Sequence, residues 1–147
     1  MSNTTSNEQQ AYDLIFELYM LLDDGDRHLL NQYDLTVPRF YLLVHLGEQP
    51  GLSPNQLSEI MFCDKSNITR LVQHLATRNL IEKRPHETDG RSFRLFLTPE
   101  GEAVREEALA THGVFNHERF AAMQGKMPEL LKLMRELRDN LHQTVHA

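Results

Sequence analysis

The chain has 147 residues, 40% of them hydrophobic and 24% charged, which is typical of a single globular domain large enough to bury its own core. Its one cysteine excludes an intrachain disulfide framework and fits a reducing compartment, and the polar first ten residues lack the apolar stretch of a secretory signal. Because no apolar run reaches the length that a bilayer requires, we expect a cytoplasmic protein that makes no membrane contact. The formal net charge of −6 argues against general polycation behaviour, so any nucleic-acid contact has to come from a local basic region.

The first third of the chain has apolar residues at helical spacing. This spacing predicts a helix over residues 8–32. The sequence Asp-Asp-Gly-Asp at 23–26 is expected to kink this helix or to split it in two. Thr36 is expected to cap a second helix, which ends before the turn at Pro50-Gly51.

Two more helices are predicted in close succession. Residues 53–56, Ser-Pro-Asn-Gln, place Ser at the N-cap, Pro at the first helical position and Gln at the third, which is the pattern of a capping box. Asp64 is expected to cap the next helix and Asn79 to end it. Its apolar positions recur at helical spacing and are Ile68, Leu71, Val72 and Leu75.

A β-hairpin is predicted after these helices. Residues 80–85 and 92–97 have the composition and alternation of strands. The link between them contains Asp89-Gly90, a strong turn signal. Thr98-Pro99 then has the residues of a helix start, with an N-cap followed by Pro at the first helical position.

The remaining residues predict helices that reach the C-terminus. The helix from Thr98 is expected to break at Gly113, and a last amphipathic helix is expected from Pro128. We therefore predict a mainly α single domain, residues 1–147: a winged helix-turn-helix with a two-stranded β wing over 35–100. The N- and C-terminal helices, in 8–32 and 100–147, are longer than this core needs and are expected to form a dimerisation lobe.

Positive charge is concentrated in one part of this acidic chain. Residues 64–94 contain seven basic and four acidic residues, a net charge of +3. On the helix from Asp64, the side opposite the apolar positions carries Lys65, Ser66, Asn67, Thr69, Arg70, Gln73 and His74. Side chains of these types read base edges and bind phosphates near the start of a recognition helix. A solvated helix face usually mixes glutamate with lysine, and this face has no glutamate, so the pattern favours double-stranded DNA as a partner.

The hairpin extends the predicted DNA-binding set to Arg84, Asp89 and Arg91. An arginine on a thin β-turn can enter a narrow minor groove, where the negative potential is enhanced. Asp89 is expected to hold the Arg91 guanidinium through a bidentate pair. The alternative is an ordinary surface ion pair, which contributes little.

One series of residues spans both helices and the hairpin: Asp64-x-Ser66-x-Ile68-Thr69-Arg70, Leu80-Ile81, Arg84, Asp89-x-Arg91 and Leu97-Thr98-x-x-Gly101. This series resembles the MarR family of bacterial transcriptional regulators, and the resemblance is strongest from Leu35 to Gly101. It implies a homodimer joined through its terminal helices, a pseudo-palindromic operator, and release by small phenolic anions or by thiol oxidation. The family often has two arginines after the wing aspartate, and only the second, Arg91, is present here.

The residues leave other functions with less support. Cys63 near a helix start suits a redox switch, but it also closes an apolar stretch, and the family's peroxide sensors carry their cysteine in the first helix. Metal binding is not expected, because His112 and His117 are five residues apart and acidic stretches such as 23–26 are usually solvated. No cofactor or catalytic motif is recognised, so the sequence does not predict an enzyme. A winged helix that binds protein would carry acidic residues on the Lys65–His74 face.

A pocket for a small aromatic or anionic effector is the last expectation. The terminal helices contain side chains that suit such a pocket: Tyr12, Phe16, Tyr19, Met123, Met127 and Met134. A dimer core explains these residues equally well, and no ligand contact is assigned to any of them.

Overall fold

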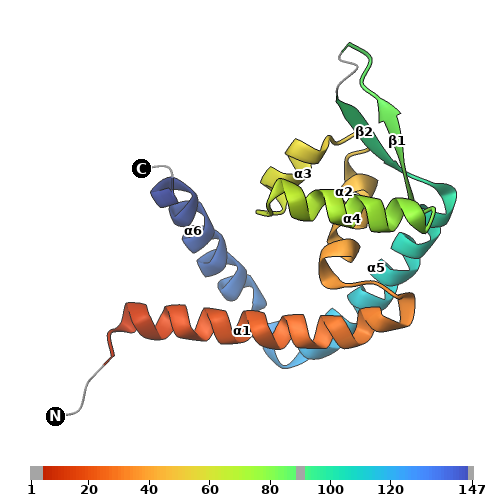
Figure 1. Ribbon diagram of the computed structural model, residues 1–147. Helices are drawn as coiled ribbons and strands as arrows, with labels where there is room; N and C mark the ends of the chain where they lie inside the picture. Colours follow the sequence, from red (N-terminus) through yellow and green to blue (C-terminus); the bar gives the residue numbers. More distant parts are fainter. Residues whose placement is uncertain (1–4, 89–91, 146–147) are drawn as a thin grey trace. The chain divides into compact units, whose positions relative to one another are not determined.

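The computed structural model in Figure 1 describes residues 5–88 and 92–145, which divide into two compact units, Met1–His112 and Gly113–Ala147. The elements in chain order are α1 (Asn7–Leu30), η1 (Asn31–Tyr33), α2 (Val37–Glu48), α3 (Pro54–Ile60), α4 (Lys65–Thr77), β1 (Ile81–Pro85), β2 (Phe93–Leu97), α5 (Pro99–Arg119), η2 (Ala121–Lys126) and α6 (Met127–Val145). Within the described part of the chain, no helix is both long and apolar enough to cross a membrane. The mainly helical fold with a two-stranded antiparallel sheet confirms the predicted fold class.

Helix α1 is continuous, so the expected kink or split at residues 23–26 is wrong. The acidic residues there are compensated within the fold. Arg27 Nε lies 3.0 Å from Asp23 Oδ2, at the i, i+4 spacing that stabilises a helix. Asp26 is buried, and its Oδ1 lies 3.1 Å from Nε2 of His112 in α5. These contacts stabilise the acidic stretch within the helix, and α1 runs through Gly25 without interruption.

Most helices start where their capping residues predict. The Ser53 hydroxyl accepts a hydrogen bond from the Gln56 amide at 3.2 Å, and the Gln56 side chain accepts one from the Ser53 amide at 2.8 Å, so the capping box is confirmed. Asp64 occupies the N-cap of α4 but its side chain makes no capping bond. At the other end, the C-cap of α4 is Arg78 rather than the expected Asn79, and Asn79 follows it with a left-handed φ of 59°.

The hydrophobic core lies between α2, α3, α4 and the hairpin. Its fully buried side chains include Phe40, Leu43, Leu46, Leu57, Ile68, Leu75 and Leu95. Burying each of these side chains stabilises the fold by about 1.5–3 kcal/mol. We call this part of the chain, residues 37–97, the winged lobe.

The wing is anchored to the lobe through β2. Strands β1 and β2 pair antiparallel, with Ile81 opposite Leu97 and Arg84 opposite Arg94. Leu95 is fully buried and also forms an isolated bridge with Leu52, in the loop between α2 and α3. Strand β2 is therefore hydrogen-bonded on one side to β1 and on the other to this loop.

The second unit contains the end of α5, η2 and α6. Helix α5 stays helical through Gly113 to Arg119, so the expected break at Gly113 is wrong. The predicted last helix is confirmed and begins at Met127. None of its residues is buried, and its exposed apolar side chains are Leu131, Leu133, Met134, Leu137, Leu141 and Val145.

Candidate nucleic-acid interface

Helix α4 presents two different faces. Ile68, Val72 and Leu75 are at most 2% exposed and pack into the core. The side chains on the other face are exposed: Lys65, Ser66, Asn67, Thr69, Arg70 and Gln73. We call this set the α4 face. Its solvent exposure agrees with the sequence prediction, and its contact with DNA stays a prediction.

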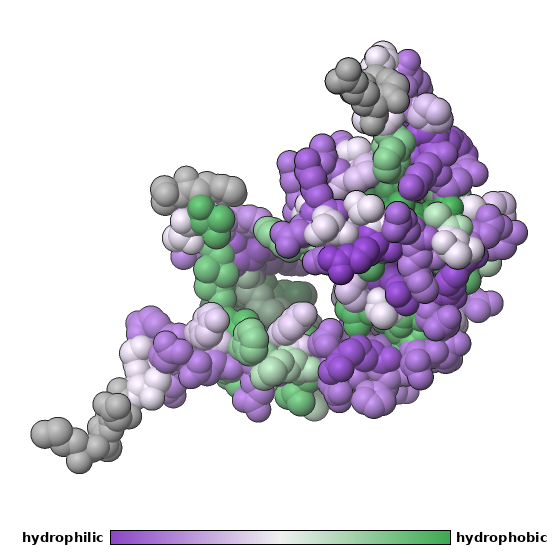
Figure 2. Space-filling model, in the orientation of Figure 1, coloured by the Kyte–Doolittle hydropathy of each residue, from purple (hydrophilic) through white to green (hydrophobic). Residues whose placement is uncertain are grey.

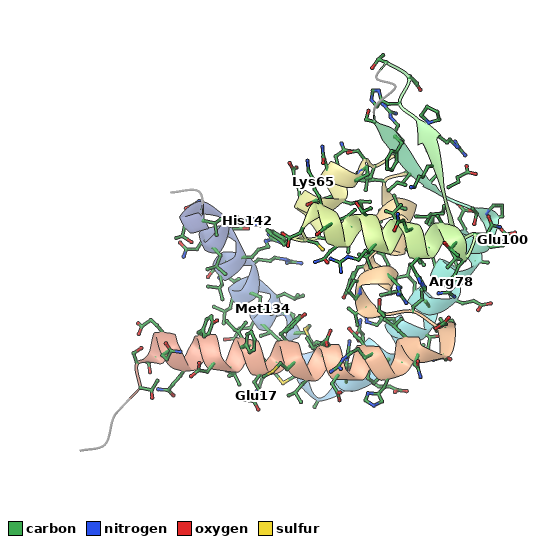
Figure 3. All side chains as sticks on the ribbon, viewed as in Figure 1. Glu17, Lys65, Arg78, Glu100, Met134 and His142 are labelled. Atoms are coloured by element: carbon green, nitrogen blue, oxygen red, sulfur yellow. The ribbon has the colours of Figure 1, made fainter. Side chains whose placement is uncertain are left out.

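Positive charge on the α4 face is not compensated by nearby carboxylates. Neither Lys65 nor Arg70 forms an ion pair with another residue that the structure describes, and Arg70 Nε donates to the Ser66 carbonyl at 3.4 Å. Figure 3 shows Lys65 extending to the side of the winged lobe toward which the hairpin projects. A duplex placed on that side would meet both the helix start and the wing.

His74 differs from the other residues predicted on this helix. It is half-buried, and its Nε2 is buried without a hydrogen-bond partner among the described residues. Burial lowers the pKa of His74, and the neighbouring guanidiniums of Arg39 and Arg78 lower it further. Arg78 itself donates to the Tyr33 carbonyl at 3.1 Å and to the Asp34 carbonyl. The C-terminal end of α4 is thus engaged with the segment before α2.

Charge on the wing is partly neutralised. Arg84 Nε donates to Glu82 Oε1 at 2.8 Å, and the Arg84 guanidinium lies 4.0 Å from the centroid of the Phe96 ring. A phosphate would have to compete with Glu82 for this guanidinium. The predicted tip residues Asp89 and Arg91 lie outside the described residues, so their roles stay predictions.

Sequence reasoning gave no role to Arg94, which faces Arg84 across the strand pair. Arg94 is half-buried, and its Nη2 lies 3.4 Å from Nε2 of His86. Within the described residues it has no acidic partner. Its membership in the basic region was the only sequence signal. The surroundings of Arg94 include the loop between α2 and α3. No local sequence pattern indicates that this loop pairs with β2.

Cys63 lies in the turn between α3 and α4. It is half-buried and packs against the core, as expected of a structural thiol. Its amide donates to the Ser58 carbonyl at 3.1 Å, and its carbonyl accepts from the Ser58 hydroxyl. Across residues 5–88 and 92–145, no group of three or more His, Cys, Asp or Glu side chains is placed to hold a metal ion.

Comparisons with known proteins agree with this geometry. Residues 33–92 match the sequence model of the MarR family. The multiple antibiotic resistance protein MarR of Salmonella typhimurium is 30% identical over 105 residues, which cover 69% of this chain and 72% of that protein. A putative MarR-like regulator from Bacillus cereus has a similar structure, with a TM-score of 0.83 and 23% identity over 92% of this chain and 98% of the other. The PcaV regulator of Streptomyces coelicolor was solved with its natural ligand. It has a TM-score of 0.70 and 27% identity, over 83% of this chain and 89% of that chain.

Proposed function

Because this chain belongs to the MarR family of transcriptional regulators, which bind DNA through a winged helix, we propose that it is a repressor that binds a pseudo-palindromic operator as a homodimer. The proteins it matches are transcriptional regulators rather than enzymes. A small-molecule effector then releases the operator. The α4 face carries this proposal, because it is exposed, basic and free of acidic residues in a chain whose net charge is −6.

The residues of the α4 face divide by the chemistry they offer to DNA. Asn67 and Gln73 carry amides that match adenine edges, and Arg70 carries the fork that matches guanine. Lys65 and Ser66, in the first turn, suit phosphate oxygens. Arg91, one hairpin away, is proposed to enter the adjacent minor groove, as the family resemblance implies.

A homodimer is supported by exposed apolar side chains on the terminal helices. On α1 these include Tyr12, Phe16 and Tyr19, which are 52–64% exposed. On α6 they include Leu133 and Leu137. Figure 2 shows the apolar side chains of both helices at the surface. Exposed apolar surface of this kind on each helix marks an interface, and a second copy would supply the second α4 helix for the next major groove.

An effector is supported by PcaV, which was solved with its natural ligand. A ligand that binds best when the two α4 helices are wrongly spaced for DNA would lower operator occupancy by shifting the population. The thiol alternative has less support, because Cys63 is half-buried in the turn that positions α4.

The test is to select DNA from a random pool with the purified protein and to sequence it. We expect a pseudo-palindromic sequence whose half-sites are one helical turn apart. Arg70→Gln is expected to lower affinity for that sequence about tenfold or more, since a bidentate base contact contributes about 1–3 kcal/mol. Arg138→Gln removes the same charge from α6, where Arg138 pairs with Asp139, and is the control. Failure to enrich any sequence would reject the proposal.

A further inference from the structure

An open pocket of about 550 Å³ lies between the loop that joins α2 to α3 and the part of the hairpin that contains His86, Ser92 and Arg94. Polar side chains line it, among them Ser53, Asn55, Gln56, His86 and Arg94. Of the residues that the structure describes, none that lines the pocket is acidic. The pocket therefore offers hydrogen-bond donors and one permanent positive charge, and its described lining has no carboxylate to repel an anion.

Arg94 supplies that charge, and its ion pairing differs from that of Arg84, which lies opposite it on β1. Arg84 is held by Glu82 in an ion pair. Arg94 lies on the same face of the hairpin, with its Nη2 3.4 Å from Nε2 of His86, and it pairs with no carboxylate of the described residues. A half-buried guanidinium without a counter-ion is electrostatically unfavourable, so an incoming anion would be stabilised there.

The walls of the pocket are fixed before any ligand binds. The Gly51 amide donates to the Leu95 carbonyl at 2.9 Å, and the Leu95 amide donates to the Leu52 carbonyl at 3.0 Å. Gly51 adopts a φ of +91°, a conformation that favours glycine, and brings the loop against the Arg94 side chain. These bonds hold the loop and β2 in one arrangement, so little ordering is required on binding.

From this setting we infer that the pocket binds a backbone phosphate of DNA through Arg94, outside the base pairs read by α4. The inference rests on the proposed function, since it assumes that DNA docks on this lobe. Helix α3 and the hairpin, which flank the pocket, both contact α4 (Figure 1). The guanidinium fork and the neighbouring hydroxyl and amide groups match phosphate oxygens. A phosphate fixed there would set the register of α4 on the duplex, because backbone contacts position a protein without reading sequence.

The test compares DNA binding as a function of salt for the full-length protein and its Arg94→Gln variant. Each protomer of the proposed homodimer carries one Arg94, so the variant should lose two phosphate contacts, which reduces the slope of log K against log salt by about two. Binding to specific and random DNA should weaken alike, about tenfold at low salt. Arg27→Gln is the control, because it removes one charge from α1, where Arg27 already pairs with Asp23. Arg94→Lys should keep the slope and lose only part of the affinity, since a lysine keeps the charge without the fork.

A second arm uses the unaltered protein, so that misfolding of a variant does not decide the result. Replacing operator phosphates one at a time by neutral methylphosphonates should reveal one position in each half-site that weakens binding of the wild-type protein and has no further effect on Arg94→Gln. If the wild-type protein binds DNA but no such position exists and the salt slope of Arg94→Gln is unchanged, the pocket inference is overturned while the proposed function stands.

Two other outcomes separate the sources of phosphate and the two proposals. Inorganic phosphate is added to the protein without DNA, and the His86 ring resonances are followed. If these resonances shift in the wild-type protein but not in Arg94→Gln, and the salt slope of DNA binding is the same for both proteins, the pocket is a small-anion site. That result overturns the DNA-phosphate inference. If the wild-type protein shows no salt-dependent DNA binding at all, the proposed function and this inference both fail.

Discussion

Phe62, in the turn before α4, adopts a conformation that its side chain does not favour. Its φ is +50° and its side chain is 87% exposed. The other described non-glycine residues with positive φ are Asp34 and Asn79, types that tolerate this region through their short polar side chains. For a bulky residue the left-handed conformation costs about 1–2 kcal/mol. Burial offsets little of this cost, because most of the ring is in solvent.

Phe62→Gly is expected to raise thermal stability. Glycine removes the left-handed penalty, and its greater freedom in the unfolded chain offsets about 0.5–1 kcal/mol of that gain. The net effect should be an increase of several tenths of a kcal/mol in the free energy of unfolding, measured by thermal or urea denaturation. Phe62→Ala is the control, since it keeps Cβ and therefore the strain. Equal melting temperatures for the Gly and Ala variants would show that the backbone is not strained.

At the scale of elements, the start of α5 fixes the wing relative to α4. The Thr98 hydroxyl donates to the Asn79 carbonyl at 2.6 Å and accepts from the Gly101 amide at 3.0 Å. A Cβ on Gly101 would lie 1.9 Å from the Leu80 carbonyl oxygen. Only glycine allows the first turn of α5 to approach the backbone between α4 and β1 so closely. One short junction thus connects α4 and β1 of the winged lobe to the start of α5.

Gly101→Ala is expected to destabilise the protein by about 1–3 kcal/mol, because the clash is with backbone and requires the helix and strand to separate. DNA affinity should fall as well, since the wing moves relative to α4. Gly113→Ala is the matched control in the same helix: a Cβ there meets nothing within 4 Å, and alanine should stabilise the helix by about 0.5–1 kcal/mol. Equal changes in unfolding free energy for both variants would contradict this assignment.

At the scale of the whole molecule, the terminal helices carry apolar surface that the described chain leaves in solvent. Leu14, Leu18 and Leu21 of α1 are 51–64% exposed, and Leu137 and Leu141 of α6 are 42% and 51% exposed. A monomer with this surface would tend to associate. The acidic charge outside the winged lobe is compatible with a role in dimerisation rather than in DNA contact.

Leu137→Glu is expected to lower the dimer fraction, because it places a charge within the apolar side of α6. Operator affinity should fall more steeply than affinity for a half-site, since a monomer loses the effective concentration of the second α4. Sedimentation velocity measures the first effect and fluorescence anisotropy the second. Arg135→Gln changes the net charge equally on another side of α6 and is the control. A Leu137→Glu protein that stays dimeric would reject α6 as part of the interface.

The sequence alone determined the features that depend on neighbours along the chain. The capping box at Ser53, the strands flanking Asp89-Gly90 and the two faces of α4 follow from spacing and local hydrogen bonds, which act over a few residues. The sequence did not predict that α1 is continuous, because one contact of its acidic stretch is distant in the chain: the Asp26 carboxylate contacts His112, 86 positions later. Local sequence patterns identify residues that disfavour a helix, but they cannot indicate a contact with a residue far along the chain.

Only the tertiary structure decided which basic residues are available to DNA. The sequence ranked Arg84 above Arg94, yet Glu82 pairs with Arg84 while Arg94 lines a pocket whose described residues include no acid. His74 has helical spacing suited to the α4 face but lies half-buried between Arg39 and Arg78. Charge, exposure and pKa depend on what folding brings within a few ångströms. Composition therefore located the basic region, and three-dimensional contacts determined the part each of its residues can play.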